Sequence, residues 1–105
     1  MKPAAGPQWW PNMTTKYTFT LGTTVATPGA LQALREAGES PLGYLARHAT
    51  GDWGDLDTDD KRENELSVRE GYRILSAYHL GTGVKLWIIT EADRSSTTIL
   101  LPEEY

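Results

Sequence analysis

The sequence contains no cysteine among its 105 residues. This absence excludes disulfide bonds, a thiolate nucleophile, and zinc or iron–sulfur sites built on cysteine. Long apolar runs are also missing, because the longest, such as Leu86–Ile89, have the length of a strand and not of a membrane span. The start of the chain lacks the apolar stretch of a signal peptide. We therefore expect a cytoplasmic protein without a membrane partner.

Basic residues are few, with ten Lys and Arg against fourteen Asp and Glu, for a net charge of −4. A broad electrostatic contact with nucleic acid is therefore not expected. Residues 51–70 concentrate the negative charge, with eight acidic and three basic side chains. An EF-hand loop starting at Asp55 fails, since Asp60 and Leu66 occupy the positions that need Gly and Glu. We expect no metal and no cofactor, and interpret the acidic segment as solvated helix surface or a contact for a basic partner.

The chain divides into two parts by composition. Residues 1–15 hold three of the six prolines and the pair Trp9-Trp10 without any periodicity, which predicts a flexible N-terminal arm. The alternative is that the two Trp side chains dock on the domain, on a second copy or on a partner. Residues 16–105 are predicted to form one α+β domain, because apolar residues at 39% are enough for a single core.

Local patterns predict the first half of this domain. Alternation over Lys16–Leu21 predicts an N-terminal strand. Two helices are expected to start at Thr27-Pro28 and Ser40-Pro41, where an N-cap precedes a proline at the first helical position. Gly38 and Gly51 are expected to end them.

A third helix is expected from Asp57 or Thr58 to Gly71, with a thin apolar face. Three consecutive strands follow, over Tyr72–His79, Val84–Thr90 and Ser96–Leu101. The predicted fold is α+β, with an N-terminal strand, three short helices and a three-stranded antiparallel β-meander. Leu86–Ile89 is apolar on both faces, which places its strand at the centre of the sheet with helices over at least one face.

Three segments carry a family resemblance: Gly51–Leu56 (GDWGDL), Leu75–Tyr78 (LSAY) and Leu86–Tyr105 (LWIITEADRSSTTILLPEEY). They resemble a family of small, uncharacterised bacterial proteins from plasmids and integrated mobile elements. Members are sometimes labelled as a subunit of a type I restriction–modification enzyme. This chain has neither the glycine-rich loop nor the Asn/Asp-Pro-Pro-aromatic motif that a modification subunit needs. The resemblance therefore implies an accessory role on a mobile element and not methyl transfer.

Two clusters are candidates for binding. The loop residues Asp52, Trp53 and Asp55 lie between glycines that indicate a tight, shaped turn, with Trp53 either an anchor in the core or a ligand contact. The second cluster follows Arg94, where Ser96 and Thr98 add hydroxyl groups that can hold a phosphate or carboxylate with the guanidinium. The alternative for this second cluster is a turn followed by a Ser/Thr-rich edge strand.

Two functions from different classes follow. The first is an accessory, non-enzymatic protein-interaction domain, in which charge reversal at Asp55, Asp57 and Asp59 weakens partner capture. The second is a metal-independent ribonuclease or phosphate-binding domain, similar in element order to barnase, EndoU and RelE-like toxins. Under that alternative nucleic acid is the substrate. Its residues are His48 or His79 as the base, Arg73 and Arg94 for the phosphorane charge, and Thr98 on a phosphate oxygen.

Overall fold

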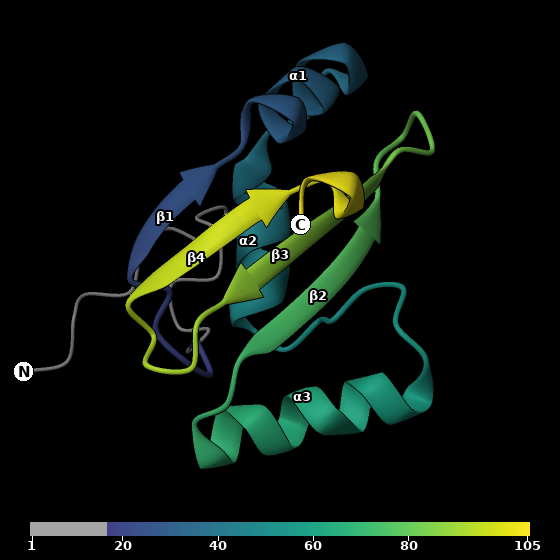
Figure 1. Cartoon of the computed structure of the whole chain (residues 1–105). Coiled ribbons are helices and arrows are strands. Elements are labelled where there is room, and N and C mark those ends of the chain that lie inside the picture. Colours follow the sequence, from purple (N-terminus) through teal and green to yellow (C-terminus); the bar gives the residue numbers. More distant parts are fainter. Residues whose placement is uncertain (1–16) are drawn as a thin grey trace, which may run out of the picture.

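A computed structural model describes residues 17–105, which form a four-stranded sheet and three helices (Figure 1). In chain order the elements are β1 (Thr23–Ala26), α1 (Pro28–Ala37), α2 (Pro41–Ala49), α3 (Thr58–Glu70), β2 (Ile74–His79), β3 (Lys85–Thr90), β4 (Ser96–Leu100) and the short 3₁₀ helix η1 (Pro102–Glu104). The α+β class and the three helices are confirmed. The predicted arm, with Trp9-Trp10, lies outside the described residues. None of the helices within residues 17–105 is long and apolar enough to cross a bilayer.

The helices begin and end at local signals. Thr27 Oγ1 accepts a hydrogen bond from the Ala30 amide at 3.2 Å, and Gly38 ends α1 with a φ of 67°. In α3, Asp57 Oδ1 accepts from the Asp60 amide at 2.8 Å, and Gly71 has a φ of 80°. These bonds join residues only a few positions apart, which is why the sequence alone predicts them.

The strand order is β1-β4-β3-β2. β2, β3 and β4 pair antiparallel with their chain neighbours, and β3 is an inner strand. The sheet is nevertheless not the predicted three-stranded antiparallel one. β1 adds a fourth strand, parallel to β4, with Val25 opposite Thr98. The sheet is therefore mixed.

The N-terminal strand is present, but the bounds predicted for it, Lys16–Leu21, are wrong. Residues 17–22 are irregular, and the strand begins at Thr23. The apolar alternation has another cause, because Phe19 packs with Trp53 and Ile74 in a second small core that Leu21 also contacts. Thr18 holds this segment through its amide and hydroxyl, which both donate to the Ala49 carbonyl. Burial of Phe19 against α2, without strand pairing, thus accounts for part of this pattern, whereas Tyr17 is exposed.

The main core lies between one face of the sheet and the helices α1 and α2, behind the sheet in Figure 1. Its buried members are Ala30, Ala33, Leu34, Tyr78, Leu80, Leu86, Ile88 and Ile99. Two residues with the spacing of buried positions, Leu31 and Leu42, are instead 43% and 71% exposed. In α2 the inward side carries Leu45, His48 and Ala49, so a histidine occupies a core position.

The outer edge of β2 is closed by other parts of the chain. The Asp55 amide donates to the Ala77 carbonyl, and the Ala77 amide donates to the Trp53 carbonyl. Asn64, from α3, pairs with both backbone groups of Leu75, at 2.7 and 3.2 Å. The loop and an α3 side chain thus take the place of a neighbouring strand, which protects this edge from intermolecular pairing.

Gly54 makes this closure possible. Its φ is 75°, and a Cβ there would lie 2.0 Å from the Ala77 carbonyl oxygen. We expect Gly54→Ala to lower the free energy of unfolding by about 2 kcal/mol, from backbone strain and overpacking. Urea denaturation measures the change. Gly43→Ala is the matched control, because nothing lies within 4 Å of its added methyl group and φ is ordinary. Equal stability of the two variants would contradict the close approach.

Candidate functional site: the helix-free face of the sheet

His48 is the centre of a buried polar chain that crosses the sheet. Its Nδ1 lies 2.5 Å from Ser76 Oγ in β2, and its Nε2 lies 2.9 Å from Thr90 Oγ1 in β3. Thr90 Oγ1 is 2.7 Å from Thr97 Oγ1 in β4, which donates to the Leu21 carbonyl at 2.7 Å. All four polar side chains have no exposed surface.

The direction of these bonds determines the histidine tautomer. Leu21 offers only a carbonyl, so Thr97 uses its single hydroxyl hydrogen there and accepts from Thr90. Thr90 has then used its own hydrogen and accepts from His48 Nε2–H. Nδ1 is left as an acceptor for the Ser76 hydroxyl. The ring is therefore neutral and carries its proton on Nε2.

Burial keeps this ring neutral. It lowers the pKa of His48 from 6.5 to about 4, with a further contribution from the positive charge of Arg94. The rings of Phe19 and Trp53 pack against the imidazole with centroids at 5.2 and 6.0 Å. These contacts give His48 a structural role in the core. Its ring lacks the solvent access that the base of a ribonuclease needs.

Arg94 is also occupied by the fold. Its guanidinium donates to the carbonyls of Ser67, Tyr72 and Glu91 at 2.8, 2.7 and 3.1 Å. The group lies 5.6 Å from the ring centroid of Phe19, on the side of the sheet that also holds His48. His48 and Arg94 therefore lie near each other, as the alternative function requires, but with the Phe19 ring in contact with both.

The cluster predicted after Arg94 is divided between the two faces of the sheet. Successive strand side chains point to opposite faces, and Thr97 points into the polar chain. Ser96 and Thr98 consequently face the other way, away from the Phe19 side that Arg94 contacts. The guanidinium and the two hydroxyls do not converge on one point.

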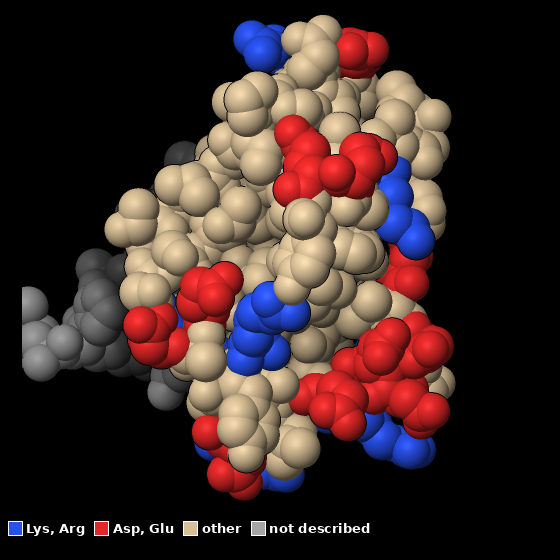
Figure 2. Space-filling model, in the orientation of Figure 1, with Lys and Arg blue, Asp and Glu red and all other residues tan. Residues whose placement is uncertain are grey.

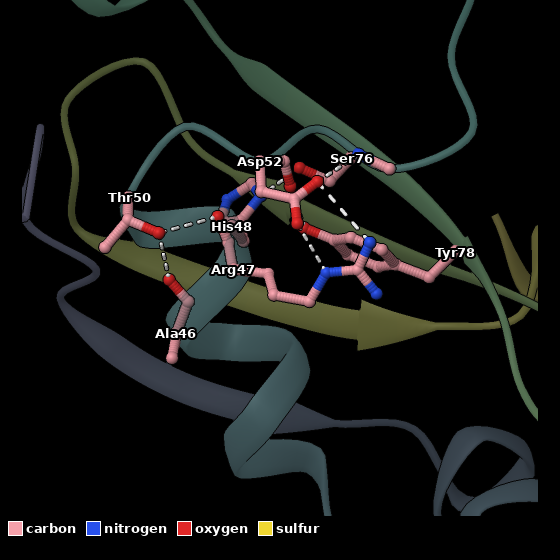
Figure 3. Close-up of polar contacts among 8 residues, drawn as sticks. Ala46, Arg47, His48, Thr50, Asp52, Ser76 and Tyr78 are labelled. Carbon is pink, nitrogen blue, oxygen red and sulfur yellow. Dashed lines mark hydrogen bonds and ion pairs between the residues drawn. The ribbon is translucent and has the colours of Figure 1, made fainter. Parts of the chain in front are cut away.

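The Gly51–Leu56 loop is fixed by its own polar contacts. Asp52 pairs with Arg47 of α2 at 2.7 Å, and this bond lowers the pKa of the carboxyl group (Figure 3). The Arg47 guanidinium lies 4.6 Å from the ring centroid of Tyr78, whose hydroxyl donates to the Asp52 carbonyl at 2.7 Å. Burial raises the pKa of Tyr78 to about 12, so the phenol stays protonated.

The other predicted loop residues have separate partners. Trp53 is 3% exposed and its indole donates to Glu65 at 3.2 Å, as expected for an anchor in the core. Asp55 pairs with His79 at 2.7 Å, and the hydrogen bond from His79 lowers the pKa of the Asp55 carboxyl group. His79 and Arg73 lie at opposite ends of β2, roughly 20 Å apart along the strand. They cannot act on the same phosphate.

The opposite face of the sheet carries no α-helix, although the short 3₁₀ helix η1 lies over part of it, and we call it the helix-free face (Figure 1). The strand registers place Val25, Thr98, Ile89 and Leu75 in one row across it and Leu100, Trp87 and Ala77 in the next. Figure 2 shows a broad tan area over β1 and β4, with acidic and basic side chains around its margins. The part of this face over β1 and β4 is therefore largely uncharged, while Ile89, Leu100 and Ala77 are buried.

Three large side chains meet on the helix-free face. The Tyr105 ring lies edge-on to Trp87, with centroids 5.9 Å apart, and the Arg73 guanidinium lies 5.4 Å from the Tyr105 centroid. Tyr105 is 66% exposed and Trp87 is half-buried. Sequence reasoning named Arg73 and missed the two aromatics. The alternation of strand side chains could have predicted that Trp87 lies on the other face of the sheet from Leu86 and Ile88. No local pattern predicts that Tyr105 lies beside it.

No protein-family model, curated protein or solved structure matches the chain. The resemblance to the plasmid and mobile-element family therefore stays a prediction.

Proposed function

We propose that this protein is a non-enzymatic protein-interaction domain that binds its partner through the helix-free face. The observation that carries the proposal is the meeting of Trp87, Tyr105 and Arg73 on a sheet face without an α-helix. Trp, Tyr and Arg are the residue types that contribute most often to protein–protein binding energy. The uncharged surface beside them, over β1 and β4, resembles the centre of an interface, where charged residues are depleted.

The two edges of the sheet differ in whether a partner can reach them. The β2 edge is closed by Asn64 and the Trp53–Asp55 backbone. At the other edge, β1 bonds to β4 through backbone groups that point toward β4, such as the Thr23 amide. Among the described residues, no hydrogen bond is formed by the outward backbone groups of Thr24 and Ala26. A partner on the helix-free face therefore has access to this edge as well.

The ribonuclease alternative gains no support from the geometry. Its candidate base His48 is buried and both its ring nitrogens are bonded. Arg94 donates to three carbonyls, and the remaining candidates His79, Arg73 and Thr98 are distributed along the face.

The proposed surface is tested by paired substitutions. The double variant Val25→Lys/Thr98→Lys places two charges on the helix-free face, while Leu31→Lys/Leu42→Lys places the same charges on exposed positions of α1 and α2. We expect proteins captured from a lysate by the wild type to be captured by the α1/α2 variant and lost by the face variant, because unpaired charge opposes desolvation of an interface. Capture that is equal for all three proteins would contradict the proposal.

A further inference from the structure

A groove of about 310 Å³ lies between α3 and β2. It shares Arg73 and Leu75 with the helix-free face, so the two surfaces are continuous. Leu56 and Leu75 provide its apolar lining, and Asp60 and Glu63 line it from α3. A volume of about 310 Å³ is at the lower limit for small-molecule sites and suits a long side chain better than a cofactor.

The charges in this groove are unbalanced. Asp60 and Glu63 are three residues apart on α3 and so lie on the same side of the helix. Both are exposed, and within residues 17–105 neither takes part in an ion pair.

Asn64 and Arg73, two other polar residues of the groove, have partners elsewhere. The Asn64 side chain uses its carbonyl and its amide on the Leu75 backbone. The Arg73 guanidinium lies against the Tyr105 ring, on the helix-free face, and forms no ion pair with either carboxylate. The two carboxylates are therefore the acidic groups that the groove offers to a ligand, beside the Ser67 hydroxyl.

We infer that the groove binds an Arg or Lys side chain from an extended, otherwise apolar segment of a protein partner. This inference rests on the proposed function and specifies the chemistry of the partner. The methylene stem of the basic side chain packs on Leu56 and Leu75, while its charged end meets Asp60 and Glu63. Apolar residues of the same segment reach the adjoining surface at Trp87 and Tyr105.

An NMR titration of the full chain tests this inference. The probe is an eight-residue peptide in which Arg alternates with Val, and the comparison peptide has Glu in place of Arg. We expect the Arg peptide to shift the Leu75 amide, the Asn64 side-chain amide and the Trp87 indole signals. Higher salt should weaken the effect, because the carboxylates are exposed. Binding of the Glu peptide with equal affinity, or shifts elsewhere only, would overturn the inference.

Matched variants locate the site. Asp60→Asn/Glu63→Gln should weaken the Arg peptide about fivefold, as expected for two exposed ion pairs. Asp59→Asn/Glu70→Gln removes the same net charge from exposed α3 carboxylates outside the groove, and should change affinity less than about twofold. Equal weakening by both variants, or equal binding of free arginine amide, would show general attraction of cations and overturn the inference.

The lysate experiment separates this inference from the proposed function. If capture depends on Val25 and Thr98 but the Arg peptide does not bind, the helix-free face remains the interaction surface and the basic segment is excluded. If the peptide binds in the groove but Val25→Lys/Thr98→Lys captures the same proteins as the wild type, the groove binds cationic segments and the proposed function fails.

Discussion

Acidification from about pH 7 to about pH 4.5 should lower the free energy of unfolding by about 2 kcal/mol through His48 alone. In the folded protein burial holds the pKa of His48 at about 4, compared with an ordinary value of 6.5. Between pH 6.5 and about pH 4, His48 is protonated in the unfolded chain and neutral in the folded protein. This stabilisation is therefore complete above pH 6.5 and is lost as the pH falls toward about 4. Urea denaturation across this range measures it.

His48→Gln is the variant that isolates this titration. Its neutral amide can donate to Thr90 and accept from Ser76, so the polar chain keeps both neighbours. We expect this variant to lose about 2 kcal/mol less than the wild type between pH 7 and pH 4.5, because the carboxyl groups with lowered pKa values, such as Asp52, remain in both proteins. Equal slopes in His48→Gln and the wild type would show that other groups cause the whole pH dependence.

His48→Ala should be more damaging, at about 3 kcal/mol, because it adds a cavity and leaves the Ser76 and Thr90 hydroxyls without their partner. The Gln variant should recover part of this loss. Near-neutral stability of the Ala variant would contradict the buried polar chain.

Replacing Arg94 should have a comparably large effect. Arg94→Ala is expected to cost about 3 kcal/mol, because three carbonyls from α3, the α3–β2 connection and the β3–β4 connection lose a charged donor. Arg94→Lys should still cost about 2 kcal/mol, since an ammonium group cannot reproduce the planar fork of donors. Urea denaturation at pH 7 measures both variants.

The backbone of Arg94 offers a second comparison. Its φ of 61° is in the left-handed region, where glycine is favoured. Arg94→Gly should therefore be more stable than Arg94→Ala by about 1 kcal/mol, although both lose the guanidinium. Arg73→Ala is the control, because Arg73 is exposed and contacts Tyr105 without bonding a carbonyl. A lysine variant as stable as wild type would show that charge alone matters at position 94.

The candidate site was only partly visible in the sequence. The order of elements followed from local patterns, whereas the choice between a core anchor and a ligand contact for Trp53 needed the structure, in which the side chain is buried. The sequence did not predict the roles of His48 and Arg94. Whether a histidine is buried, and which carbonyls an arginine meets, depends on residues that are distant in the sequence. Ser76, Thr90 and Thr97 come from three strands, and only sheet pairing brings their hydroxyls into one chain.

The helix-free face depended on pairing in the same way. The sequence does not show which face Trp87 and Val25 occupy. The pairing of β1 with β4 and the packing of helices on the other face decide it. Tyr105 reaches Trp87 only because η1 turns the chain back across the sheet.

The sequence by itself determined the helix ends and the α+β class, because caps such as Thr27 and Asp57 bond to amides only three residues away. Only the tertiary structure decided the position of β1, the buried side of α2 and the partners of Arg94. Glu104 illustrates the reason. Its carboxylate accepts from Gly29 at the start of α1, a bond between residues 75 positions apart, where the first turn of α1 has no acid of its own. Such contacts depend on how distant segments pack, and no local pattern encodes them.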